Sequence, residues 1–186
     1  GLDFTPGDIV MTCGAAAAIN VTLKTILNPG EEVIILSPYF VEYGYYIDNH
    51  QGVAVTVPTN ADFQPNLDAI EAAITRQTRG IVINSPNNPT GVVYPSASLQ
   101  QLADLLHRKQ TEYGSQIYLI SDEPYRRIIF DNLTYPQVFP HYENTIVVTS
   151  HAKDLALPGE RIGYIAVNPN CPDRQELANG LTFCNR

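Results

Sequence analysis

The sequence has few cysteines, few basic residues and no long apolar run. Cys13, Cys171 and Cys184 are odd in number and lack C-x-x-C spacing, so neither a disulfide framework nor a zinc site is indicated. The 11 Lys and Arg residues, against 19 Asp and Glu, give a net charge of -8 and form no cluster. This balance argues against a nucleic-acid or anionic-membrane surface, so we expect small molecules or proteins as partners.

No apolar run approaches the roughly 20 residues that span a bilayer, and the N-terminus lacks the basic and apolar regions of a signal peptide. These absences predict a cytoplasmic protein. A G-x-G-x-x-G motif after the first predicted strand is also missing, which disfavours a dinucleotide-binding domain. The 186 residues are enough for one well-buried domain, and no linker, repeat or low-complexity stretch divides them.

Short β-rich runs alternate with helical patterns along the chain, which is typical of an α/β domain with a largely parallel sheet. Strands are predicted at 8–12, 32–36, 53–57, 80–84, 117–121, 145–149 and 163–167. Helices are predicted at 15–27, 41–49, 67–74, 98–113 and 172–181. Several strands are continuously apolar, as expected when helices cover both faces of a sheet. The predicted fold is a three-layer α/β/α sandwich with a mostly parallel, roughly seven-stranded mixed sheet.

Polar motifs follow five of the predicted strands. They lie at 14, 37–40, 84–91, 121–125 and 150–153. In open α/β sheets, ligands bind beyond the carboxyl ends of the strands. We therefore expect these five segments to face one rim of the sheet.

The segments 150–153 (Ser-His-Ala-Lys) and 158–161 (Pro-Gly-Glu-Arg) are the most informative motifs. They set a potential amine nucleophile, Lys153, beside a hydroxyl of Ser150 and a guanidinium of Arg161, both suited to a phosphate. An amine with anion ligands close by is what pyridoxal 5′-phosphate (PLP) chemistry requires. Taken alone, a lysine at a strand end is more often a solvated charge.

Two further features fit the same cofactor. Gly14, Ala15 and Ala16 open a helix with small residues, so a phosphate can approach its free N–H groups, although good helix formers also explain the run. Phe40 is a candidate partner for the face of the cofactor ring, although any one aromatic residue is more often in the core.

Three residues are candidates for the polar edge of the cofactor ring. Asp122 closes an apolar strand, where a carboxylate can hold a pyridine nitrogen protonated; an N-cap or turn aspartate is the alternative. Tyr125 is suited to donate to the phenolate oxygen, or is a core tyrosine. Asn88, between two prolines, presents its amide to the same oxygen, or forms an ordinary Asn-Pro turn.

At these residues the chain resembles the PLP domain of the class I/II aminotransferases, a fold type I group that includes the aspartate aminotransferases. Four blocks carry the resemblance in order and spacing: Asn88-Pro89-Thr90-Gly91, Asp122-x-x-Tyr125, Ser150-x-x-Lys153, and Arg161 within Pro-Gly-x-Arg-x-Gly-Tyr. The likeness runs through almost the whole chain. It implies a PLP-dependent enzyme, a homodimer, that transfers an amino group between an amino acid and a 2-oxo acid.

The resemblance also implies roles for three catalytic residues. Lys153 forms the internal aldimine with PLP and later moves the proton between the α-carbon of the substrate and C4′ of the cofactor. Asp122 supports the protonated ring, while Tyr125, together with Asn88, tunes the phenolate.

Enzymes of this family have an N-terminal arm and a C-terminal small domain that this sequence does not match. We therefore expect residues 1–186 to be the large, PLP-binding domain, with weak or no turnover alone. Two other readings stay open. The first is a lyase, because related folds with the same cofactor residues catalyse β-elimination or other lyase steps. The second is a domain without catalysis that keeps the fold for dimerisation or as a folding unit.

Overall fold

One sheet of seven strands runs through the computed structural model, which describes residues 2–186. The strands are β1 (Ile9–Thr12), β2 (Glu32–Ser37), β3 (Val53–Pro58), β4 (Thr78–Asn84), β5 (Tyr118–Asp122), β6 (Thr145–Ser150) and β7 (Gly163–Val167). Their order in the sheet is β1-β7-β6-β5-β4-β2-β3. Strand β7 is antiparallel to both neighbours, and every other pair is parallel. The mostly parallel mixed sheet is therefore confirmed.

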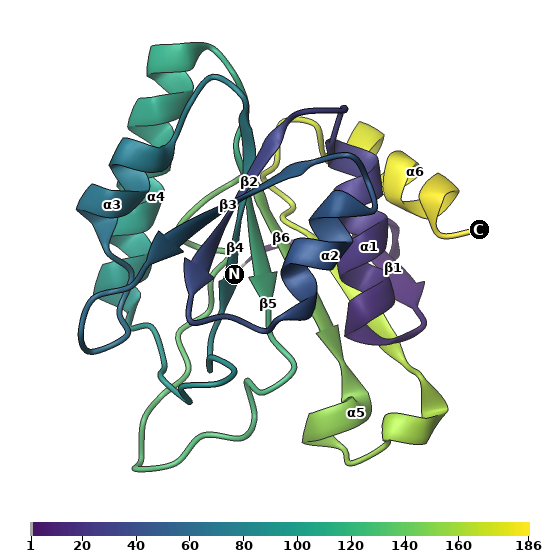
Figure 1. The fold of residues 1–186 in the computed structure, drawn as a ribbon. Coiled ribbons are helices and arrows are strands. Elements are labelled where there is room, and N and C mark those ends of the chain that lie inside the picture. Colours follow the sequence, from purple (N-terminus) through teal and green to yellow (C-terminus); the bar gives the residue numbers. More distant parts are fainter. Residues whose placement is uncertain (1) are drawn as a thin grey trace.

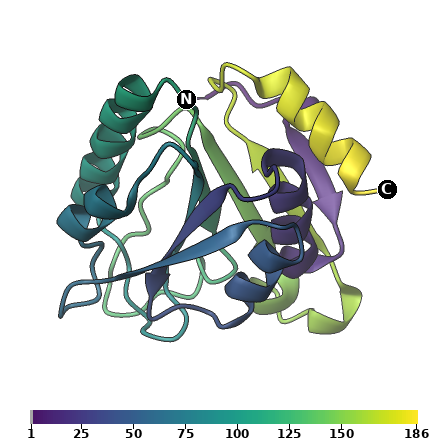
Figure 2. The ribbon, with the colours of Figure 1, turned by 45° about the horizontal axis from the view of Figure 1, so that its top comes forward.

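Helices cover both faces of the sheet, as Figures 1 and 2 show. One face carries α1 (Gly14–Ile26), α2 (Glu42–Asp48) and α6 (Arg174–Cys184), and the other carries α3 (Leu67–Ala73) and α4 (Ser96–Tyr113). The remaining elements are single turns: η1 (Pro6–Asp8), α5 (His151–Asp154) and η2 (Pro158–Glu160). The predicted three-layer α/β/α sandwich is thus confirmed.

The continuously apolar strands explain the two layers, because successive side chains of a strand point to opposite faces. In β2, Val33 and Ile35 join the core beneath α1 and α2, whereas Ile34 and Leu36 join the core beneath α3 and α4. All four side chains are buried. A strand with apolar residues at every position is stable only between two helical layers, which is where β2 lies.

All the predicted strands and long helices are present, with shifts at their ends. The prediction that Asp8 begins the first strand was wrong: Asp8 ends the turn η1, and its carboxylate accepts a 2.6 Å hydrogen bond from the backbone N–H of Thr5. The last helix begins at Arg174 and runs to Cys184, beyond the predicted end at Leu181. The short turns α5 and η2 were not predicted, because so few residues carry no periodic pattern.

The strand directions bring five carboxyl ends to one edge of the sheet. Strand β1 is antiparallel to β7, which is antiparallel to β6, so β1 points the same way as β6 and the parallel strands. The ends of β1, β2, β4, β5 and β6 therefore share the edge that carries α5, at the bottom of Figure 1. This edge is the predicted rim.

Among residues 2–186, no helix is both long and apolar enough to cross a membrane. The same residues contain no group of three or more His, Cys, Asp or Glu side chains placed to hold a metal ion. The three cysteines are free thiols, with Cys13 exposed and Cys171 buried.

Candidate active site

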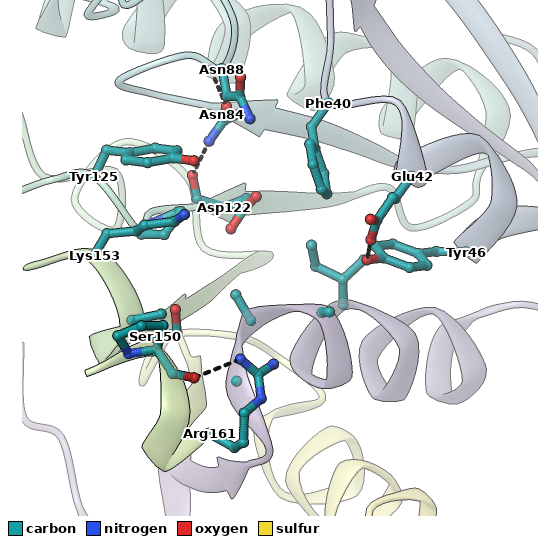
Figure 3. A pocket seen from close by; sticks show the side chains of 17 residues that line it. Phe40, Glu42, Tyr46, Asn84, Asn88, Asp122, Tyr125, Ser150, Lys153 and Arg161 are labelled. Atoms are coloured by element: carbon teal, nitrogen blue, oxygen red, sulfur yellow. Dashed lines mark hydrogen bonds between the residues drawn. The ribbon is translucent and has the colours of Figure 1, made fainter. Parts of the chain in front are cut away.

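A cavity of about 310 Å³ opens at the rim where the five strands end (Figure 3). It is lined by all ten residues that the sequence singled out: Gly14, Ala15, Ala16, Phe40, Asn88, Asp122, Tyr125, Ser150, Lys153 and Arg161. These residues come from segments spread over almost the whole chain. The fold therefore brings the ten candidates to one place, while their chemical roles stay predictions.

Arg161 lies against the N-terminus of α1 because Gly14 has no side chain. Gly14 has a φ of +83°, and a Cβ there would approach Nη2 of Arg161 to 2.9 Å. Nη1 of Arg161 donates a 3.0 Å hydrogen bond to the carbonyl of Pro158, which fixes the guanidinium at the wall of the cavity. A cation and the positive end of a helix dipole thus face the same space.

Ser150 contributes a hydroxyl to the same wall. It is the last residue of β6 and is buried, and its side chain makes no capping hydrogen bond to α5. The cap position of α1, Cys13, likewise makes no side-chain hydrogen bond to that helix. Backbone N–H groups, a hydroxyl and a guanidinium together form a cradle for an anion such as phosphate.

Asp122 lies at the end of β5 in the depth of the site, with only 5% of its surface exposed. Its Oδ2 accepts a 2.5 Å hydrogen bond from the hydroxyl of Tyr43, while its Oδ1 is buried without a partner among the described residues. Burial raises the pKa of Asp122 to about 7; the Tyr43 hydrogen bond opposes this rise, and the charge of Glu123 adds to it. An orphaned carboxylate oxygen at a cavity is suited to accept from an N–H group of a ligand.

Asn84 braces the floor of the site. Its side-chain amide donates a 2.8 Å hydrogen bond to the backbone carbonyl of Asp122 and accepts a 2.6 Å hydrogen bond from the backbone N–H of Asn88. The side-chain oxygen of Asn87 accepts hydrogen bonds from the backbone N–H and the hydroxyl of Thr90, which shapes the loop. Asn88 is thereby held with its side chain at the cavity, as Figure 3 shows.

Lys153 and Tyr125 lie on the same side of the cavity. Nζ of Lys153 lies 5.9 Å from the centre of the Tyr125 ring. Burial, followed by the nearby Asp122 carboxylate, raises the pKa of Tyr125, so its hydroxyl stays a hydrogen-bond donor. Pro124, between Asp122 and Tyr125, also lines the cavity.

The opposite wall comes from α2 and the segment before it. The ring of Phe40 meets the ring of Tyr43 edge to face, with centroids 5.7 Å apart. Glu42 accepts a hydrogen bond from the hydroxyl of Tyr46, and both residues line the cavity. Burial is the main reason that the pKa of Tyr46 is raised.

Sequence reasoning missed seven lining residues: Ile19, Glu42, Tyr46, Asn84, Pro124, Ala152 and Pro158. Pro124, Ala152 and Pro158 lie inside or next to the recognised motifs, so their positions could have been inferred. Asn84 opens the Asn-Ser-Pro-Asn-Asn segment, but its contact with Asp122 spans 38 residues and leaves no local signal.

The arrangement fits a flat, phosphate-bearing cofactor with a protonated ring nitrogen. The fit rests on three observations: the orphaned Oδ1 of Asp122, the cradle that a Cβ on Gly14 would fill, and the amine of Lys153 at the cavity wall. An amine, a buried acid and an anion site within one cavity are suited to covalent carbonyl chemistry on an amino compound.

Comparisons with known proteins identify the family of this chain. The family model described as aminotransferase class I and II matches residues 1–185. A probable aspartate/prephenate aminotransferase from Thermus aquaticus is 40% identical over 166 residues, which cover 88% of this chain and 42% of that protein. A probable aspartate aminotransferase from Methanocaldococcus jannaschii is 32% identical over 181 residues, which cover 97% of this chain and 46% of that protein.

Solved structures give the same result. An amino transferase from Eubacterium rectale matches with a TM-score of 0.96 and 40% identity, covering 98% of this chain and 46% of that one. The aspartate aminotransferase of Thermus thermophilus with maleate matches with a TM-score of 0.86 and 35% identity. The match covers 100% of this chain and 46% of that one. The chain therefore spans less than half the length of these relatives.

Proposed function

The chain belongs to the class I and II aminotransferase family, and we propose that residues 1–186 form the PLP-binding large domain of an aminotransferase. The observation that carries the proposal is the convergence of the Lys153 amine, the Asp122 carboxylate and the anion cradle on one cavity. When bound, PLP would supply an electron sink for the electrons released at the α-carbon of an amino acid.

The phosphate would lie in the cradle of Ser150, Arg161 and the first turn of α1. Each element offers donors: a buried hydroxyl, a planar guanidinium and the backbone N–H groups of Ala15 and Ala16. Phe40 and Pro124 both line the cavity and would contact the flat cofactor ring. These contacts bind and orient the group but do no chemistry.

Lys153 would do the covalent and proton-transfer work. Its Nζ would hold the cofactor covalently and, when free, would carry a proton between the α-carbon of the substrate and the cofactor. The centre of the Tyr125 ring lies 5.9 Å from Nζ, and both residues line the cavity. Lys153 is therefore proposed as both anchor and general base.

Asp122 would hold the proton on the ring nitrogen. Its free Oδ1 would accept the N–H of the ring, an interaction that favours the ionised carboxylate. Asn88 and Tyr125 would donate hydrogen bonds to the phenolate oxygen at the other side of the ring. Asp122 thus strengthens the electron sink, and the other two residues adjust it.

The proposed substrates are an amino acid and a 2-oxo acid. Relatives named as aspartate and aspartate/prephenate aminotransferases support this class. We also propose a homodimer, which the family resemblance supports. Exposed apolar side chains near the site, among them Leu155, Leu157 and Ile162, offer a surface for such an association.

A single-turnover experiment tests the proposal. The purified protein is loaded with PLP, mixed with aspartate, glutamate or an aromatic amino acid, and analysed for 2-oxo acid and ammonia. We expect slow formation of at most one 2-oxo acid per cofactor, with the amino group retained on the cofactor. Ammonia release would indicate elimination, and a folded protein that binds no PLP would indicate a domain without catalysis.

A further inference from the structure

Tyr43 joins the helix α2 to the carboxylate at the floor of the site. Its hydroxyl donates a 2.5 Å hydrogen bond to Oδ2 of Asp122, although the two residues are 79 positions apart in the chain. Both are buried, with 2% of Tyr43 and 5% of Asp122 exposed. This contact is absent from the motifs that the sequence made visible.

The hydrogen bond makes the two oxygens of Asp122 unequal. Oδ2 is occupied by Tyr43, while Oδ1 is buried without a partner among the described residues. Because Asp122 lines the cavity, the unoccupied oxygen is the one left for a ligand. Rotation of the carboxylate would break a buried hydrogen bond to a charged group, which Tyr43 therefore resists.

The ring of Tyr43 has a separate contact, with Phe40 at the cavity wall. The two rings meet edge to face with centroids 5.7 Å apart. The hydroxyl serves Asp122, and the ring supports Phe40, so the two roles can be separated by removing the hydroxyl alone. A phenylalanine at position 43 keeps the ring and loses only the donor.

We propose that Tyr43 is a positioning residue, whose hydroxyl favours the ionised form of Asp122 and aims Oδ1 at the ring nitrogen of the cofactor. The proposal rests on the proposed function. The titratable groups beside Asp122 are Tyr43 and Tyr46 from α2 and Glu123 and Tyr125, its neighbours in sequence. Glu42 from α2, Lys153 from α5 and Arg161 line the same cavity. Of these, Tyr43 is the one that donates a hydrogen bond to the carboxylate.

The direction of the pKa effects supports this role. Burial raises the pKa of Asp122, and the hydrogen bond from Tyr43 works against that rise. Burial together with Asp122 raises the pKa of Tyr43 itself, so its hydroxyl keeps its proton and remains a donor. Without this donor, Asp122 would be protonated up to a higher pH and would no longer accept from a ring N–H.

The Tyr43→Phe variant tests the proposal, with Tyr142→Phe as its matched control. The Tyr142 hydroxyl is equally buried and donates a 2.7 Å hydrogen bond to the carbonyl of Ile117, but Tyr142 lies in the core beneath α4, on the opposite face of the sheet. PLP affinity is measured across pH for both variants and the parent protein. We expect Tyr43→Phe to weaken PLP binding about tenfold or more and to shift the pH midpoint of binding upward by about one unit, whereas Tyr142→Phe changes neither.

A double-mutant cycle shows whether Tyr43 acts through Asp122. In an Asp122→Asn background, Tyr43→Phe should change PLP affinity less than twofold. Full additivity of the two substitutions, or an unshifted pH midpoint in Tyr43→Phe, would overturn the proposal.

A second measurement needs no cofactor and separates this proposal from the proposed function. Carboxyl ¹³C NMR of the cofactor-free protein gives the pKa of Asp122 directly. We expect that pKa to rise by about one unit in Tyr43→Phe and to stay unchanged in Tyr142→Phe. An unchanged pKa would contradict the role of Tyr43, whereas failure of the parent protein to bind PLP would contradict the proposed function alone.

Discussion

Gly163 touches the backbone of Gly14, so the strand β7 packs directly against the start of α1. A Cβ on Gly163 would lie 2.6 Å from the carbonyl carbon of Gly14 and 2.6 Å from the carbonyl oxygen of Thr149. Both clashes are with backbone, which cannot move aside as a flexible side chain can. The contact sets the position of the α1 N-terminus, where the proposed phosphate cradle lies.

Gly163→Ala should therefore damage stability and cofactor binding together. We expect the free energy of unfolding to fall by about 1–3 kcal/mol, as for other overpacked sites, and PLP affinity to fall with it. Urea unfolding and PLP titration measure the two effects. Gly159→Ala is the control, since a Cβ there meets nothing within 4 Å; a Gly163→Ala protein as stable as this control would contradict the packing argument.

The buried carboxyl of Asp122 should make stability depend on pH. Its folded-state pKa of about 7 lies above the ordinary value of 3.8 for an aspartate, so the folded protein binds a proton that the unfolded chain has released. This contribution to stability is present below about pH 4 and is lost as pH rises to about 7. The size of the loss is on the order of 4 kcal/mol.

Asp122→Asn should remove this dependence. We expect the slope of unfolding free energy between pH 4 and 7 to be flatter in Asp122→Asn than in the parent protein, as measured by urea titrations. The exposed Asp48 gives the control, Asp48→Asn, which should keep the parent's slope. Identical slopes in all three proteins would show that Asp122 is not the group that titrates.

The pair of Asp8 and Arg174 ties the N-terminal turn η1 to the helix α6. Nη2 of Arg174 donates a 2.6 Å hydrogen bond to Oδ2 of Asp8, of which only 2% is exposed. The hydrogen bond from Arg174 lowers the pKa of Asp8 to about 2. A carboxylate with a lowered pKa stabilises the fold above its unfolded pKa, so this contribution is lost as pH falls from about 4 to about 2.

Asp8→Asn should cost about 1–2 kcal/mol of unfolding free energy at pH 7, because Arg174 is partly solvated and the pair is weakened by water. The difference from the parent protein should shrink toward pH 2. Asp3→Asn, at a nearby exposed position, is expected to have no effect. A stability difference for Asp8→Asn that does not change between pH 7 and pH 2 would argue against the ion pair.

The layers of the fold and the place of the site were predictable from the sequence for a physical reason. Alternation of apolar strands with amphipathic helices requires a parallel sheet covered on both faces, and parallel strands carry their carboxyl ends to one edge. Motifs that follow strands, such as those of Asn88, Asp122 and Lys153, are then brought together whatever their separation. Strong periodicity and strand-end position therefore located the cavity.

Contacts that depend on one side chain meeting another across the fold were not predictable. Tyr43 reaches Asp122 from a helix on the covering layer, and its local pattern is that of an ordinary core tyrosine. The ion pair of Asp8 with Arg174 spans 166 positions, and Asp8, which was predicted to begin a strand, lies at the end of a turn. Such pairs depend on the tertiary packing of distant segments, and local sequence propensities carry no information about it.

The attachment site of PLP is the most direct measurement of the central claim. The sequence has three lysines, Lys24, Lys109 and Lys153, so reduction with borohydride and peptide mass spectrometry can assign the adduct completely. We predict one adduct, at Lys153, that persists in Lys24→Ala and Lys109→Ala and disappears in Lys153→Ala, whose circular dichroism stays that of the parent because the side chain is exposed. A reducible adduct that survives in Lys153→Ala would contradict the account.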